Sequence, residues 1–80
     1  MRIDKFLKVS RILKRRAVAS EACSSNKVTV NGRAVKPAYR LAVGDEVAIS
    51  FASGALKFKV KSLNEKVNAK EADTLYEIIV

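Results

Sequence analysis

The sequence predicts an α+β fold in which two N-terminal helices pack on a small, mainly antiparallel sheet of four to five strands. Two periods support this prediction: apolar residues recur every three to four positions up to residue 25 and alternate every second position from residue 27. In addition, Asn31-Gly32 stands between two alternating segments, which is a strong hairpin signal. Because 80 residues leave room for one small core, we expect a single domain over 1–80.

The first helix is predicted from Ile3 to Val9. Its apolar residues fall on one narrow stripe: Ile3, Phe6 and Leu7. The phase is lost after Ser10, because continuing the same helix would turn Ile12 toward the basic side. Asp4 is the only acid in the first sixteen residues. It falls where a carboxylate meets free backbone N–H groups and the positive end of the helix dipole.

The second helix is predicted from about Arg16 to Ser25. Small apolar residues share one side of it, which indicates close approach to another element: Val18, Ala19, Ala22 and Cys23. Asn26 follows as a left-handed C-terminal cap, a role in which asparagine is second to glycine. We interpret Cys23 as a small core residue, because a reactive thiol needs exposure as well as positive neighbours.

The rest of the chain is predicted to form short strands whose alternating apolar residues face the core. In order, they are a hairpin over 28–35, then 47–51, 56–60 and 76–80. Pro37 ends the hairpin, so residues 38–43 should be a loop, and the polar segment 64–73 should be a loop with a helical turn. Tyr39 and Tyr76 are interpreted as packing residues, since a core with few aromatics needs them.

Positive charge is concentrated at the N-terminal end. Residues 1–16 hold seven basic residues and one acid, a net charge of +6. Residues 17–40 hold four and one, net +3, and residues 41–80 hold five and six, net −1, which together give +8. An ordinary surface interleaves the two signs. This asymmetry therefore indicates a polyanionic partner.

The sequence shows no constellation for catalysis, metal or cofactor binding. Histidine is absent, the three glycines are scattered, and Asp45-Glu46 belongs to a turn, so we expect a protein that is not an enzyme. One cysteine without histidine does not make a zinc site. No stretch approaches the roughly 20 apolar residues that span a bilayer, and no signal-peptide run opens the chain. We therefore expect a cytoplasmic protein without membrane contact.

Three segments, RIDKFLKVSR, KRR and KVTVNGRAV, resemble in their order and spacing the RNA-binding domain of the ribosomal protein S-four family. The likeness covers a core motif of about 2–51, and the strands of 56–80 would complete the sheet. The family usually has Ser or Thr beside the arginine matched by Arg16, where this chain has Arg15 and Ala17. The N-terminal cap of the second helix is thus left unexplained.

The resemblance implies which residues bind RNA. Those on and between the helices are Arg2, Lys5, Lys8, Arg11, Lys14, Arg15 and Arg16. Such side chains suit phosphates, and arginine can also stack on an unpaired base. The hairpin adds Asn31, Arg33 and Lys36, although the turn alone accounts for Asn31. A further lysine stripe is interpreted instead as protection of an edge strand from aggregation: Lys57, Lys59 and Lys61.

The chain is most similar to members of the family that consist of this domain alone. These are bacterial factors of ribosome-associated quality control and, next, the small heat-shock ribosome-binding protein. The resemblance implies a monomer that binds ribosomal RNA and tRNA on the large ribosomal subunit. It also implies support of C-terminal alanine tailing of stalled nascent chains, with the alanine-tailing factor as a further partner.

Other functions stay open at this point. The domain can act in trans with an RNA-modifying enzyme, because pseudouridine synthases and tyrosyl-tRNA synthetases contain similar domains, or it can act in heat-shock ribosome recycling. A basic amphipathic helix can also bind acidic membrane, although a folded domain needs the same apolar stripe inside. DNA is a further possible polyanion, but the resemblance is to proteins that bind structured RNA.

Overall fold

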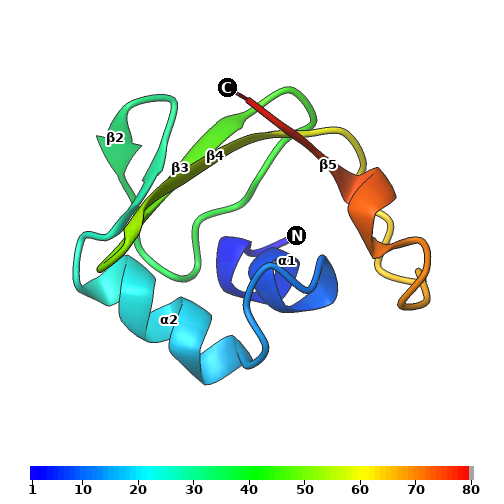
Figure 1. Cartoon of the computed structure of the whole chain (residues 1–80), viewed down its shortest axis with the longest axis horizontal. Helices are drawn as coiled ribbons and strands as arrows, with labels where there is room; N and C mark the ends of the chain where they lie inside the picture. Colours follow the sequence, from blue (N-terminus) through cyan, green and yellow to red (C-terminus); the bar gives the residue numbers. More distant parts are fainter. Residues whose placement is uncertain (80) are drawn as a thin grey trace.

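The computed structural model describes residues 1–79 and places two helices on one side of a curved five-stranded sheet (Figure 1). The helices are α1, Ile3–Val9, and α2, Arg16–Ser24. The strands are β1, Val28–Val30; β2, Arg33–Ala34; β3, Glu46–Phe51; β4, Gly54–Val60; and β5, Tyr76–Ile78. A short 3-10 helix, η1, Ala72–Leu75, precedes β5. The predicted α+β fold is confirmed.

The strands lie in the order β2-β1-β3-β4-β5, and every neighbouring pair is antiparallel. The edges are therefore β2 and β5, and β4 is an interior strand. The interpretation of Lys57 and Lys59 as protection of an edge is wrong. Lys59 instead lies opposite Glu46 on one side and Glu77 on the other. These lysines belong to the solvent face of the sheet, where opposite charges pair across strands.

The apolar stripe of α1 is buried against the sheet. Ile3, Phe6 and Leu7 are fully buried, as the predicted helix requires. The ring of Phe6 stacks on Phe58 of β4 with centroids 6.1 Å apart, and Tyr76 meets Phe58 edge-on at 5.6 Å. This aromatic stack joins α1 to β4 and β5, and it confirms Tyr76 as a packing residue.

The N-terminal end of α1 is fixed by backbone hydrogen bonds to the loop after β2. The Ile3 N–H donates to the carbonyl of Tyr39 at 2.8 Å, and the Leu41 N–H donates to the carbonyl of Met1 at 3.0 Å. Arg2 and Arg40 form an isolated β-bridge between these two contacts. The start of α1 is thus held in place by a segment more than thirty residues away in the sequence.

Two turns adopt the conformations that the sequence predicts. After α2, Asn26 has φ 59°, and the N–H groups of Asn26 and Lys27 donate to the carbonyls of Cys23 and Ala22. These two bonds are the Schellman pattern. In the hairpin, Asn31-Gly32 has φ values of 52° and 85°, as a two-residue turn of this type requires. The start of α2, in contrast, has no side-chain cap, so the sequence departure beside Arg16 stays unexplained.

Three residues predicted to pack in the core are exposed, and one of them is Tyr39 in the loop after β2, which is 39% exposed, so its interpretation as a packing residue is wrong. Val18 of α2 is 47% exposed and Phe51 at the end of β3 is 42% exposed. Val18 and Phe51 border one open hollow between α2 and the end of β3, so these two elements approach each other there without covering either side chain.

Only Ala19 and Cys23 of α2 are buried, on the side that packs on α1 and β1. The periodicity placed Ala19 and Cys23 correctly on the buried side of α2, but it was wrong for Val18, which it placed on the same side. Val80, which completes the predicted last strand, lies outside the described residues.

Neither helix in the part of the chain that the structure describes is long and apolar enough to cross a bilayer.

We expect Phe6→Leu to lower the free energy of unfolding by about 1–2 kcal/mol, because it removes ring contact with Phe58 from a fully buried site. Urea denaturation followed by circular dichroism measures this. The matched control is Val18→Ala on the exposed side of α2, which should stay within about 0.5 kcal/mol of the wild type. Equal losses in the two variants would contradict the assignment of the core.

Candidate nucleic-acid interface

The buried carboxylate of Asp4 gathers cations from both helices. Its side chain is only 4% exposed and belongs to the first turn of α1. One oxygen accepts from Nη2 of Arg2 at 2.9 Å, and the other accepts from the Lys5 N–H at 2.7 Å. The second oxygen also lies 3.5 Å from Nη2 of Arg16, the first residue of α2. Asp4 thus holds two arginines from separate elements beside α1.

Both arginines keep donors free for a ligand. Their side chains are 43% and 48% exposed for Arg2 and Arg16, respectively. A guanidinium carries five N–H donors in a fixed fork, so a contact through one nitrogen leaves most of them available. Asp4 therefore positions these side chains without occupying them fully.

The other cations of residues 1–16 are of two kinds. Nζ of Lys5 lies 2.8 Å from Oε1 of Glu65, and this hydrogen bond, followed by the charge of Lys5, lowers the pKa of Glu65. Four further residues are exposed and form no ion pair with any of residues 1–79: Lys8, Arg11, Lys14 and Arg15. These four side chains can meet a polyanion without breaking an existing pair.

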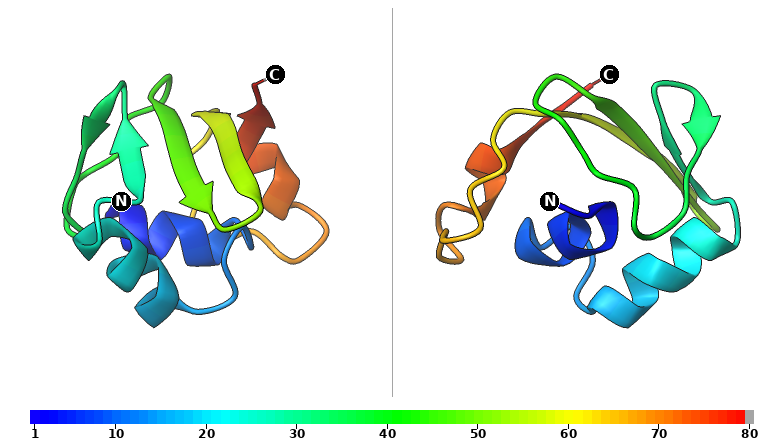
Figure 2. Two further views of the ribbon diagram at one scale, coloured as in Figure 1. Left: turned by 60° about the vertical axis from the view of Figure 1, so that its left-hand side comes forward. Right: turned by 180° about the vertical axis from the view of Figure 1, so that it is seen from behind.

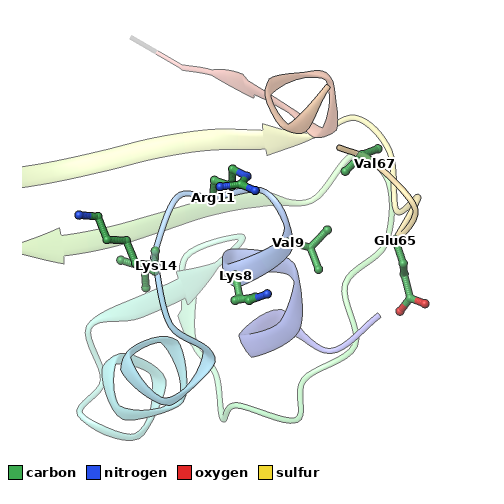
Figure 3. Close-up of a pocket in the computed structure, with 7 residues that line it drawn as sticks. Lys8, Val9, Arg11, Lys14, Glu65 and Val67 are labelled. Carbon is green, nitrogen blue, oxygen red and sulfur yellow. The ribbon is translucent and has the colours of Figure 1, made fainter. Parts of the chain in front are cut away.

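Three of these free cations surround a hollow beside the end of α1. It has a volume of about 420 Å³ and is lined by Lys8, Val9, Arg11, Leu13, Lys14, Glu65 and Val67. Figure 3 shows Lys8 on α1, Arg11 and Lys14 on the segment that leads to α2, and Glu65 on the loop before η1. Lys8, Arg11 and Lys14 therefore lie around one hollow, and Lys5 adjoins it through its ion pair with Glu65. Arg2 and Arg16 meet at Asp4, at the other end of α1.

The hairpin candidates lie apart from this hollow. Figure 2 shows the hairpin of β1 and β2 at the opposite side of the molecule from the loop that carries Glu65 and Val67. Arg33 and Lys36 are exposed and line a second hollow with Tyr39. RNA contact by the hairpin stays a prediction.

Asn31 already uses both polar atoms of its side chain. Its Oδ1 accepts from the Glu46 N–H at 3.0 Å, and its Nδ2 donates to Oδ1 of Asp45 at 3.2 Å. The other carboxylate oxygen of Asp45 accepts from the Ala42 N–H at 2.9 Å. Asn31 thus joins the hairpin turn to the turn before β3, a structural role that the sequence analysis gave only to its backbone.

The sequence analysis missed two contributors to the surface. Arg40 is exposed and forms a β-bridge with Arg2, which brings one more cation to the start of α1. Glu65 and Val67 come from the polar segment 64–73, which was expected to be a loop with a helical turn and was given no part in the site, and they bound the hollow beside α1. No local pattern marks these residues, because long-range packing alone brings them to α1.

Cys23 has no catalytic character. The residue is 1% exposed, and burial, followed by the negative charge of Asp4, raises the pKa of its thiol to about 11. The thiol is therefore protonated at neutral pH and closed to solvent. Nor do residues 1–79 gather three His, Cys, Asp or Glu side chains into a possible metal site.

One side of α1 packs on a small sheet, and cations cover its other side; α2 and the β1–β2 hairpin follow. This arrangement is typical of a small RNA-binding domain. The chain belongs to the S4 domain family, whose family model matches residues 1–47. This confirms the resemblance found in the sequence.

Individual relatives extend the match over nearly the whole chain. The chain is 44% identical to the RQC P-site tRNA stabilizing factor of Halalkalibacterium halodurans, over 98% of this chain and 89% of that one. It is 43% identical to the protein of the same name from Streptococcus pneumoniae, over 99% and 90%. The trimeric structure of Vibrio cholerae Heat Shock Protein 15 has a TM-score of 0.90 at 25% identity, over 99% of this chain and 81% of that one.

We expect Asp4→Asn to weaken binding to structured RNA by about threefold to tenfold, although it raises the net positive charge by one. The neutral amide can still accept from the Lys5 N–H but no longer attracts Arg2 and Arg16. The free energy of unfolding should also fall, by about 1–3 kcal/mol. Fluorescence anisotropy with a labelled tRNA at fixed salt measures the affinity.

The control for Asp4→Asn is Glu21→Gln, which adds the same charge at an exposed position of α2 without an ion pair among residues 1–79. This control should bind the tRNA slightly more tightly than the wild type. If Asp4→Asn binds as tightly as Glu21→Gln, the gathering role of Asp4 is contradicted.

The stability of the fold should fall as the pH rises from about 9 toward 11. A thiol with a higher pKa in the folded state holds its proton more tightly there, so its contribution is complete below about pH 9 and is lost above it. The slope is at most about 1.4 kcal/mol per pH unit for one proton. Because lysines and tyrosines titrate in the same range, the measurement is the difference in slope between wild type and Cys23→Ala. Identical slopes would contradict the burial of the thiol.

Proposed function

We propose that this protein is a non-enzymatic RNA-binding factor that acts on the ribosome and contacts ribosomal RNA and tRNA on the large subunit. The observation that carries the proposal is the common surface around α1, where Asp4 holds Arg2 and Arg16 next to the free cations. The names of the relatives at 43–44% identity, RQC P-site tRNA stabilizing factor, support tRNA as one of the ligands.

The surface suits a nucleic-acid backbone for two physical reasons. Arg2 and Arg16 are held in place before binding, so less side-chain freedom is lost when they contact phosphates. Lys8 and Lys14 are exposed and have no acidic partner among residues 1–79, so they add attraction without an exchange of partners. The remaining predicted contacts, including those of the hairpin, belong to the same proposal.

The finer role that we propose is support of ribosome-associated quality control. A small rigid domain beside a P-site tRNA can hold that tRNA on a large subunit from which the small subunit has left. C-terminal alanine tailing of the stalled chain could then proceed, with the alanine-tailing factor as a protein partner. In this role residues 1–80 act as one domain, in the cytoplasm and as a monomer.

The shared fold with Heat Shock Protein 15 keeps open the alternative from the sequence analysis, a role in heat-shock ribosome recycling. That structure is described as trimeric, so a trimer in solution would weigh against the proposed monomer. Sedimentation equilibrium of the full chain distinguishes the two states.

We expect tagged protein from growing cells to co-sediment with large subunits that carry tRNA, and with few small subunits. Arg16→Ala should reduce this fraction several-fold and lower the log–log salt slope of tRNA binding by about 1, since one cation is lost from the surface. Sucrose-gradient sedimentation and anisotropy titrations measure the two effects.

The control is Lys57→Ala, which removes one exposed cation from the solvent face of the sheet, away from α1. It should leave co-sedimentation unchanged. The proposal is overturned if the wild-type protein is entirely free of ribosomal particles. It is also overturned if duplex DNA binds as tightly as folded RNA, because a general polyanion binder would behave in that way.

A further inference from the structure

The hollow beside the end of α1 is lined by apolar and acidic residues as well as by the cations that would bind a phosphate backbone. Its volume of about 420 Å³ is within the range of about 300–1,000 Å³ that small-ligand sites occupy. Figure 3 shows Lys14 at one end, Glu65 at the other, and Val9 between them. The lining is thus cationic at one end, apolar in the middle and acidic at the far end.

The apolar part of the lining is fixed in place. Val9, Leu13 and Val67 are partly buried and pack against the hydrophobic core, so they keep one exposed side each toward the hollow. Contact with a duplex backbone involves phosphates and sugars and does not require an apolar surface. Unpaired bases, in contrast, are bound by apolar and aromatic surfaces and by arginine planes.

The backbone at Arg11 gives an independent reason to look for a ligand here. Arg11 follows the last residues of α1 with φ 62°, in the left-handed region that disfavours most side chains. The other non-glycine residues of 1–79 with positive φ are Asn26 and Asn31, and asparagine tolerates this region. Glycine would be the least strained choice at position 11.

The fold does not explain why position 11 carries arginine. The side chain is exposed and forms no ion pair with any of residues 1–79. Its location on the hollow, between Lys8 and Lys14, does explain it. The left-handed backbone itself belongs to the C-terminal cap of α1, where the Arg11 N–H donates to the carbonyl of Lys8 at 3.0 Å. The fold does not require an arginine there, and strained side-chain choices of this kind are typical of functional sites.

We infer that the hollow is a site for one unstacked nucleotide of the bound RNA. Its phosphate lies on Arg11, Lys14 and Lys8, and its base lies against Val9 and Val67. This inference rests on the proposed RNA binding and deepens it, because it names the RNA element that the surface selects: a bulge or loop rather than a regular helix. The far end adds a preference among bases, since a carboxylate accepts from the amino group of adenine, cytosine or guanine but finds no such group on uracil.

Glu65 is held at this end of the hollow by Lys5. The 2.8 Å contact orients the carboxylate, and one oxygen remains available for a second donor. The pair links α1 to the loop before η1, so the acidic end lies beside Lys5 and on the far side of Val9 from Lys14.

The test compares three RNA hairpins with the same stem sequence and the same short, tightly stacked terminal loop: one with a continuously paired stem, one with a bulged adenosine in the stem, and one with a bulged uridine at the same position. Because the loop is shared, a difference in affinity reports the bulge alone. Affinity for the wild-type protein is measured by anisotropy at one salt concentration. We expect the bulged-adenosine hairpin to bind about fivefold to tenfold more tightly than the paired hairpin, and the bulged-uridine hairpin to lie between them.

Two variants and one control locate the effect. Arg11→Gly should remove most of the preference for the bulge while raising Tm by a few degrees, because glycine adopts the left-handed conformation without strain. Val67→Ser, which changes no charge, should reduce the preference and leave binding to the paired hairpin unchanged. Arg15→Ala removes a free cation outside the hollow and should weaken binding to all three hairpins equally.

The outcomes separate this inference from the proposed function. Equal affinity for the three hairpins overturns the nucleotide site and leaves RNA binding in place, whereas no binding to any RNA overturns the proposed function itself. If Val67→Ser fails to fold, NMR of the wild type decides instead. The amide signals of residues 65–67 should shift with the bulged-adenosine hairpin and not with the paired one, and equal shifts overturn the inference.

Discussion

One buried carboxylate connects the folding of this domain to its surface. Asp4 is almost fully enclosed, and a charge in that position is tolerated only when partners replace the water it has lost. Arg2, Arg16 and the Lys5 N–H replace it, and they come from three places along the chain. The need to pair the buried Asp4 carboxylate therefore also brings the exposed Arg2 and Arg16 side chains together at the surface. A cationic surface arranged in this way is already formed before any RNA arrives.

The surface is completed by the part of the chain beyond the family match. The S4 domain family model ends at residue 47, whereas Glu65 and Val67 come from the loop before η1. The loop reaches α1 through the contact of Glu65 with Lys5 and through the packing of Val67 against the core. Residues 61–79 thus contribute more than the last strand of the sheet. They turn an open row of cations into a hollow with an apolar wall and an acidic end.

Features that depend on a few consecutive residues were predictable. The helical period gave α1 its bounds and its buried stripe, because backbone geometry repeats every 3.6 residues. Asn26 and Asn31 predicted two turns, because few residues other than glycine and asparagine adopt a left-handed backbone without strain. The concentration of charge in residues 1–16 was visible by counting. All three are local properties, so no knowledge of the packed state is required to find them.

By itself, the sequence thus determined the elements, their turns and the location of the positive charge. Only the tertiary structure decided which residues are neighbours: Lys5 with Glu65, and Arg2 with Arg40. It also decided that β4 is an interior strand and that Phe51 stays exposed beside α2. These outcomes depend on how the helices and strands pack on one another. The local pattern of apolar and polar residues does not specify that packing. The hollow beside α1 exists for the same reason, since its two sides meet only when the chain has folded.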